Sequence, residues 1–155
     1  MRPRYIDALW MCSAFFAALV LAGGVLSALG AGEGGIHAAL EATARLMFLL
    51  FWPAYAGSAL VSLFGAAFQP FKRHAREFGL AFVSTLLVHL GLVARLCLIG
   101  AAPHASTFIF FGAAAVFAYL LAIFSFDAPH RAFGPQYWGL LSKVGMNYLA
   151  LRFLH

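Results

Sequence analysis

The amino-acid sequence predicts an all-α fold, an integral membrane helical bundle with about five transmembrane helices. Hydrophobic residues make up 64% of the chain and charged residues 10%, whereas soluble domains contain roughly 45–50% and about 25%. A soluble fold of this size leaves too much surface exposed to hide so many apolar side chains. The composition therefore excludes an ordinary soluble enzyme, a disordered chain and a disulfide-rich secreted module. It favours a protein whose outer surface faces lipid.

Five apolar runs are long enough to cross a bilayer, which takes about 20 mostly apolar residues. Within a single transmembrane domain, 1–155, we expect the spans at 5–29, 42–68, 78–101, 105–126 and 137–154. The fifth run is the weakest because it holds Lys143, Asn147 and Arg152. The first run is longer than the apolar part of a signal peptide, so we interpret it as a retained anchor.

Glycine and proline mark the expected boundaries, because proline lacks an N–H and disfavours helix just before it. Gly30–Gly35 predicts a turn between the first two spans, and Gln69-Pro70 opens a short basic loop that runs to Glu77. Small residues in the second span, Gly57 and Gly65 among them, predict a face that packs closely against another helix.

The positive charges predict the orientation, since cytoplasmic loops carry an excess of lysine and arginine. The cations before the first span and in alternate loops are Arg2, Arg4, Lys72, Arg73, Arg76 and Arg131. We expect a cytoplasmic N-terminus, an external C-terminus and a location in the bacterial inner (cell) membrane. Arg45, just inside the second span, is the exception. Because the cations lie at the ends of apolar runs, we expect the lipid bilayer to be the partner of this protein. We expect no binding to nucleic acid.

His89 is the most informative polar residue, because it lies about eleven residues into the third span, near mid-membrane, and ionisable groups there are costly. One interpretation is a histidine hydrogen-bonded to a neighbouring helix. The other is an axial haem ligand, since a neutral imidazole binds iron and an apolar bundle can hold the porphyrin.

A haem held by two histidines needs a second imidazole at similar depth, and His155 on the fifth span is the candidate. With a rise of 1.5 Å per residue, His89 lies roughly 16 Å and His155 roughly 27 Å above the inner edges of their spans. Helix tilt can absorb part of this difference. Arg95 and Arg152 lie near the outer ends, where they can snorkel or contact a haem propionate.

The chain from the second span to its end resembles the ferric reductase-like transmembrane domain family. That family includes the haem-binding membrane subunit of the periplasmic methionine sulfoxide reductase system. The resemblance rests on the run Arg73-His-Ala-Arg-Glu-Phe-Gly-Leu-Ala-Phe82, followed by Leu87-Val-His89, on Phe133-Gly134, and on Trp138-Gly-Leu-Leu-Ser-Lys-Val-Gly-Met-Asn-Tyr148. It covers about two thirds of the chain.

The resemblance implies a b-type cytochrome-like subunit that carries haem b on His89 and His155, both as ligands of the haem iron, for transmembrane electron transfer. Ser142 departs from the family, because it stands where relatives have a second-helix histidine. The alternative is therefore a related bundle without stable haem, which acts as a structural or assembly partner.

No glycine-rich dinucleotide motif occurs, so we expect a separate electron-donor or acceptor protein. Neither inverted repeats nor a broken helix around a polar site occurs, which disfavours a transporter.

Overall fold

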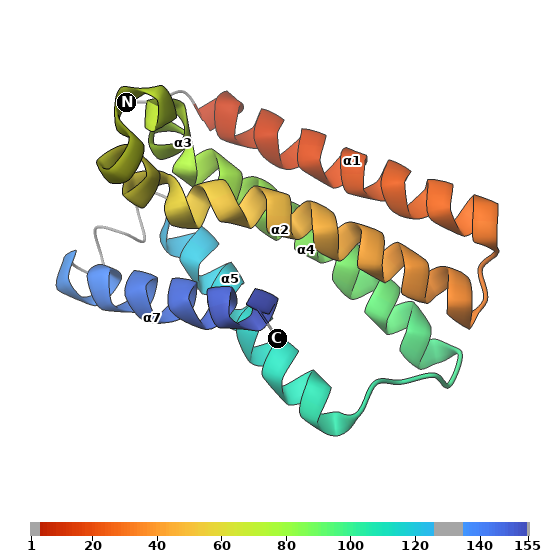
Figure 1. Cartoon of the computed structure of the whole chain (residues 1–155). Helices are drawn as coiled ribbons and strands as arrows, with labels where there is room; N and C mark the ends of the chain where they lie inside the picture. Colours follow the sequence, from red (N-terminus) through yellow and green to blue (C-terminus); the bar gives the residue numbers. More distant parts are fainter. Residues whose placement is uncertain (1–3, 126–134, 155) are drawn as a thin grey trace. The chain divides into compact units, whose positions relative to one another are not determined.

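The computed structural model describes residues 4–125 and 135–154, and all regular elements in these residues are helical. The long helices are α1 (Arg4–Leu29), α2 (Glu33–Phe64), α4 (Ala75–Leu98), α5 (Ala105–Phe124) and α7 (Pro135–Leu154) (Figure 1). A 3₁₀ turn, η1 (Gly65–Phe68), and the short α3 (Gln69–Arg73) lie between α2 and α4. The all-α prediction is confirmed.

Four stretches of the described residues are long and apolar enough to cross a membrane, and they are Tyr5–Leu29, Glu33–Arg73, Ala75–Leu98 and Ala105–Phe124. The predicted integral membrane character is therefore supported. The fifth predicted run is helical in α7 but is not among these four. Its polar residues Lys143, Asn147 and Arg152 dilute the apolar character that a spanning helix needs.

Helix α2 is longer than the sequence predicted, because it begins at Glu33 instead of residue 42. The second half of the glycine-rich segment expected to form a turn, 33–35, is therefore helical. Ile36 and Ala39 are fully buried in the first turns of α2, so their burial stabilises a helical stretch that contains too few apolar residues to be recognised from hydropathy. A Cβ atom added at Gly35 would lie 1.9 Å from the carbonyl oxygen of Gly30, so only glycine fits this tight connection.

The end of α2 also differs from the prediction. Gly65 has a φ of +80° and terminates the helix, a conformation that glycine adopts without strain. The expected basic loop is helical instead, since α3 runs through Arg73 and α4 begins at Ala75. A Cβ added at Gly57 would lie 3.1 Å from the backbone of Phe71 and Lys72. The close packing predicted for Gly57 is thus confirmed, whereas Gly65 serves as a helix end.

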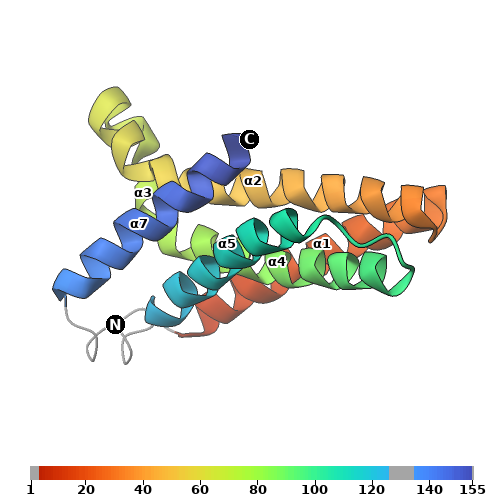
Figure 2. The same ribbon diagram turned by 90° about the horizontal axis from the view of Figure 1, so that it is seen from below.

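The chain divides into two units, Met1–Pro103 and His104–His155. In the first unit, α1, α2 and α4 lie side by side, and α2 runs antiparallel to the other two (Figures 1 and 2). One buried cluster of its core consists of small and branched apolar residues of all three helices, and they are Ala18, Ala22, Ile36, Ala39, Val88, Leu92 and Leu96. We call the end where α1 and α4 begin and α2 ends the basic end, because Lys72, Arg73 and Arg76 lie there.

The second unit consists of α5 and α7. The hydroxyl of Tyr148 on α7 donates a hydrogen bond of 3.1 Å to the carbonyl oxygen of Phe110 on α5. A Cβ added at Gly145 would lie 3.0 Å from a methyl group of Leu121, so the two helices approach closely there. The phenylalanines of 108–111 are exposed, as a lipid-facing role requires.

Candidate functional site

His89 lies on α4 against α2, where its Nδ1 atom is 2.9 Å from the hydroxyl oxygen of Thr43. Thr43 is fully buried and His89 is half-buried. The contact joins residues 46 positions apart in the sequence. It confirms the interpretation in which His89 forms a hydrogen bond with a neighbouring helix.

The surroundings of Thr43 favour one direction for the hydrogen bond in this contact. The Thr43 hydroxyl oxygen also lies 2.9 Å from the carbonyl oxygen of Ala39 and 3.0 Å from that of Leu40. A hydroxyl has one proton and carbonyl oxygens can only accept. We infer that the Thr43 hydroxyl donates its proton to one of these carbonyl oxygens and accepts from Nδ1–H of His89. We infer the tautomer with Nε2 as the remaining acceptor from this network.

The environment of this pair is apolar. Val88 and Leu92 on α4 and Ala39 on α2 are buried beside it and belong to the core of the three-helix unit. Thr85, one turn before His89, is buried and donates only within α4, to the carbonyl oxygen of Ala81 at 3.1 Å. The arrangement thus presents one fixed imidazole whose Nε2 atom can bind a metal or accept a proton.

The structure describes the side chains of two of the four predicted site residues, His89 and Arg95. Arg95 is exposed on α4, six residues beyond His89 and about 9 Å farther from the basic end. His155 lies outside the described residues, as do the side chains of Arg152 and Ser142. The predicted pairing of His89 with His155, and the propionate contacts, therefore stay predictions.

No other histidine of the first unit lies at the depth of His89 within the described residues. His37 is on α2, six residues before Thr43, which corresponds to an offset of about 9 Å along the helix. His74 precedes His89 by fifteen residues, about 22 Å. The described residues contain no group of three or more His, Cys, Asp or Glu side chains that could hold a metal ion.

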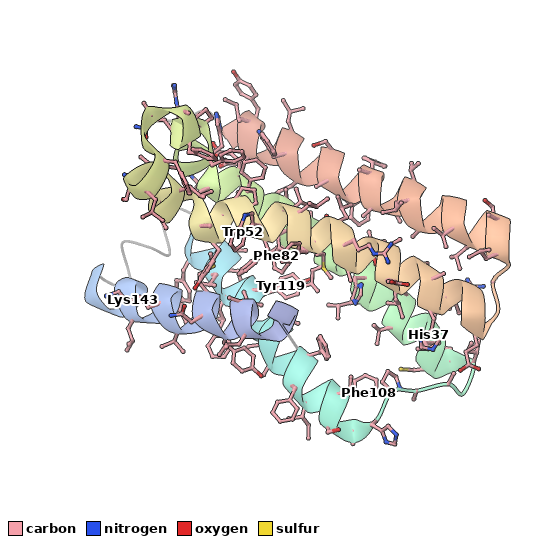
Figure 3. All side chains as sticks on the ribbon, in the orientation of Figure 1. His37, Trp52, Phe82, Phe108, Tyr119 and Lys143 are labelled. Carbon is pink, nitrogen blue, oxygen red and sulfur yellow. The ribbon has the colours of Figure 1, made fainter. Side chains whose placement is uncertain are left out.

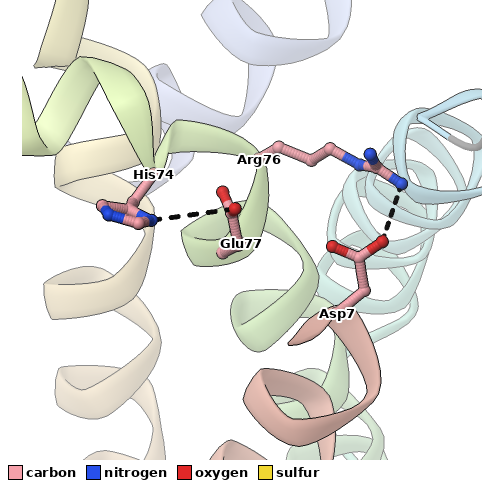
Figure 4. Close-up of polar contacts among 4 residues, drawn as sticks. All are labelled: Asp7, His74, Arg76 and Glu77. Carbon is pink, nitrogen blue, oxygen red and sulfur yellow. Dashed lines mark hydrogen bonds and ion pairs between the residues drawn. The ribbon is translucent and has the colours of Figure 1, made fainter. Parts of the chain in front are cut away.

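A second polar cluster lies at the basic end (Figure 4). The guanidinium of Arg76 donates to the carboxylate of Asp7 at 2.9 Å, and this ion pair joins α4 to α1. His74 Nδ1 lies 3.7 Å from a carboxylate oxygen of Glu77, whose side chain is 1% exposed. The indole of Trp10 on α1 stacks on the His74 ring with centroids 6.3 Å apart.

The sequence contains little information about this cluster. Asp7 is an acid near the start of the first predicted span, and Arg76 belongs to the predicted basic loop, but nothing in the sequence pairs them. One signal exists: an acid and a base near the same end of two apolar runs. That signal gains meaning only if the two helices are neighbours, which the sequence does not specify.

Comparisons with protein-family models, with curated proteins and with solved structures find no match to this chain. The resemblance to the ferric reductase-like transmembrane domain therefore stays a prediction. The site is interpreted below from its own residues.

Proposed function

We propose that this protein is a membrane b-type cytochrome-like subunit of the ferric reductase-like kind, with His89 as an axial ligand of haem b. The observation that supports this proposal is the contact between His89 and Thr43. Histidines that bind metals usually donate their other ring N–H to an oxygen, which fixes the tautomer and the ring orientation. Nδ1 of His89 is 2.9 Å from the Thr43 hydroxyl, an arrangement that leaves Nε2 for iron.

Haem b would supply reversible one-electron transfer. The chain's own residues would orient and shield it. Thr43 would hold the imidazole ring, and the buried core around Val88 and Leu92 would exclude water. We propose His155 as the second ligand and Arg95 and Arg152 as propionate contacts. A separate protein would donate or accept the electron.

A visible spectrum of the purified protein tests the proposal. We expect a Soret band that shifts on reduction and is lost in His89→Ala. His37→Ala is the matched control, because His37 is an exposed histidine on α2 that pairs with Glu33, and its removal should leave the spectrum unchanged. An unchanged spectrum in His89→Ala would eliminate His89 as a ligand.

The alternative is a bundle without stable haem that acts as a structural or assembly partner. It is favoured by the lack, in the described part of the first unit, of a second histidine at the depth of His89. Thr43 alone then explains why His89 is tolerated, since a hydrogen bond to a neighbouring helix lowers the cost of burying a polar group. Haem binding that appears only in Ser142→His would support this alternative, whereas full haem occupancy in the natural chain would eliminate it.

We further propose the bacterial inner membrane as the location, with the N-terminus in the cytoplasm. Support comes from the basic end, where the start of α1 lies with Lys72, Arg73 and Arg76. Positive charge of this kind is retained on the cytoplasmic side of a membrane.

A further inference from the structure

Helix α2 is longer than a bilayer crossing requires. Its 32 residues extend about 48 Å, whereas the hydrocarbon core of a bilayer is roughly 30 Å thick. On α1, the stretch from Ala8 to Leu29 contains no charged side chain and is about 33 Å long. The part of α2 from Glu33 to Gly57 already covers about 38 Å. The rest of α2, 58–64, is therefore not needed to cross the apolar layer.

The level of Gly57 in the three-helix unit follows from two observations. A Cβ atom added at Gly57 would lie 3.1 Å from the backbone of α3, which belongs to the basic end. Thr43 contacts His89, and Gly57 lies about 21 Å along α2 from Thr43, while Arg76 lies about 20 Å along α4 from His89. Gly57 is therefore level with Arg76, whose ion pair with Asp7 marks the end of the apolar layer.

The chain leaves this level after Gly57 and returns to it at Phe71. The last turns of α2 lead outward, Gly65 turns the chain with a φ of +80°, and η1 and α3 lead back. Figure 2 shows the end of α2 and η1 turned away from the long axis of α2. Pro53 lies within α2, and proline is a usual cause of such bends because it removes a backbone hydrogen bond. We call residues 58–70 the lateral lobe.

The lateral lobe has an apolar surface. None of its residues is charged, and Leu63 and Phe64 near its tip are 76% and 63% exposed. The ring centroid of Phe64 lies 5.4 Å from that of Phe68, which lies 6.0 Å from that of Phe71. Exposed aliphatic and aromatic side chains are unfavourable in water. They are favourable at the boundary between lipid headgroups and acyl chains, where apolar faces of surface-bound segments are buried.

The residues around the root of the lobe indicate where this boundary lies. Trp52 is 49% exposed on α2, and Figure 3 places it toward the basic end. Tryptophan is enriched at the interface between membrane and water. Lys72 and Arg73, which follow the lobe, are exposed cations of the kind that anionic lipid attracts. The lobe therefore extends from a level that has both an interfacial tryptophan and cations suited to headgroup phosphates.

We propose that the lateral lobe lies in the membrane surface at the basic end and fixes the depth of the bundle. Leu63 and Phe64 contact the upper segments of the acyl chains, and the ammonium of Lys72 contacts the phosphates of anionic lipid headgroups. Three features support lipid as the occupant. The lobe continues the surface of the candidate spans, it extends sideways where the apolar layer ends (Figure 2), and its root is positively charged. This role does not depend on haem.

A fluorescent label tests the position of the lobe in the full-length protein. In a Cys12→Ala, Cys97→Ala background, Leu63→Cys carries bimane, and the protein is placed in vesicles of phosphatidylcholine and phosphatidylglycerol in equal amounts. Lipids brominated on the acyl chain close to the headgroup should quench the label at least about twofold more than lipids brominated near the chain ends, because a surface-bound segment is buried only about 5–10 Å. Val20→Cys is the matched control, since Val20 is 75% exposed near the middle of α1. Its label should show the opposite preference.

A charge variant tests the headgroup contact. Phosphatidylglycerol brominated close to the headgroup should quench the label at position 63 more strongly than phosphatidylcholine brominated at the same carbons. Lys72→Gln should lower this preference by about fivefold, the factor that corresponds to about 1 kcal/mol for each cation near an anionic surface. Arg45→Gln is the matched control, because it removes the same charge from an exposed side chain of α2 about 18 Å from Gly57. It should leave the preference unchanged.

Three results of the labelling experiment would overturn the proposed position. Quenching by aqueous iodide without quenching by brominated lipid would place the lobe in water. Quenching by neither would show that protein covers the lobe, whether another part of this chain, a second copy or a different protein. Stronger quenching by lipids brominated near the chain ends would make residues 58–70 part of a span. The headgroup contact is refuted if Lys72→Gln leaves the lipid preference unchanged or if Arg45→Gln lowers it equally.

Discussion

The guanidinium of Arg76 donates a hydrogen bond of 2.9 Å to the carboxylate of Asp7, which lies 69 residues earlier in the chain. The Asp7 side chain is 9% exposed and that of Arg76 is 31% exposed. A nearly buried carboxylate requires a partner because burial of an isolated charge is expensive. The pair therefore fixes the register in which α1 packs against α4.

Removal of Arg76 should destabilise the three-helix unit. We expect Arg76→Ala to lower the free energy of unfolding by about 1.5–3 kcal/mol, the range for hydrogen bonds to charged groups. Denaturant unfolding in detergent micelles measures the change. Lys72→Ala is the matched control, because Lys72 is an exposed cation at the same end and its loss should change stability by less than about 0.5 kcal/mol. Equal effects of the two variants would contradict a role of Arg76 in joining the helices.

Thr43 should determine the tautomer of His89. In the natural chain we expect ¹⁵N spectra of labelled histidine to report a protonated Nδ1 at neutral pH. Thr43→Val removes the acceptor and should reduce the population of that tautomer, at a cost of about 1 kcal/mol of stability. Thr85→Val is the control, since Thr85 is also buried on α4 but bonds its own helix. A natural chain with the proton on Nε2 would refute the assignment of the donor.

In the connection between α1 and α2, alanine should be tolerated at Gly34 but should destabilise the protein at Gly35. Gly35→Ala forces the backbone at Gly30 to move, because the new Cβ would lie 1.9 Å from its carbonyl oxygen. We expect a loss of about 1–3 kcal/mol, as for other overpacked sites. A Cβ at Gly34 meets nothing within 4 Å, so Gly34→Ala should stabilise the helix by roughly 0.5–1 kcal/mol. Thermal unfolding of both variants compares them directly, and a stable Gly35→Ala protein would show that α2 begins later than Glu33.

Reporter fusions should distinguish four spans from five. A reporter fused after Arg76 should be cytoplasmic, and one fused after His155 should be external if α7 crosses the membrane. A cytoplasmic reporter at both positions would mean that α7 does not cross. Neutralisation of Lys72, Arg73 and Arg76 together should scramble the orientation, because in the proposed topology these cations would retain the basic end in the cytoplasm.

The sequence alone determined the fold class and most of the long helices. Apolar runs of 20 or more residues must be helical in lipid, where each backbone polar group needs an internal partner. Hydropathy depends only on residues close together in the sequence, so it can be calculated without knowledge of the packing. The bounds of α1, α4 and α5 accordingly lie within a few residues of the bounds of the predicted spans. The first turns of α2 escaped prediction because Glu33, Glu41 and several glycines lower the local hydropathy. Contacts of Ile36 and Ala39 with other helices stabilise those turns.

The tertiary structure decided which helices are neighbours, and therefore which polar residues meet. His89 was recognisable from its position in an apolar run, but its partner Thr43 was not, since a buried threonine bonded to its own helix leaves no signal in the sequence. The same holds for Asp7 and Arg76. Hydropathy describes how each residue interacts with lipid, whereas the contacts of 2.9 Å that hold these pairs depend on helix direction, register and rotation, which only packing between distant segments determines.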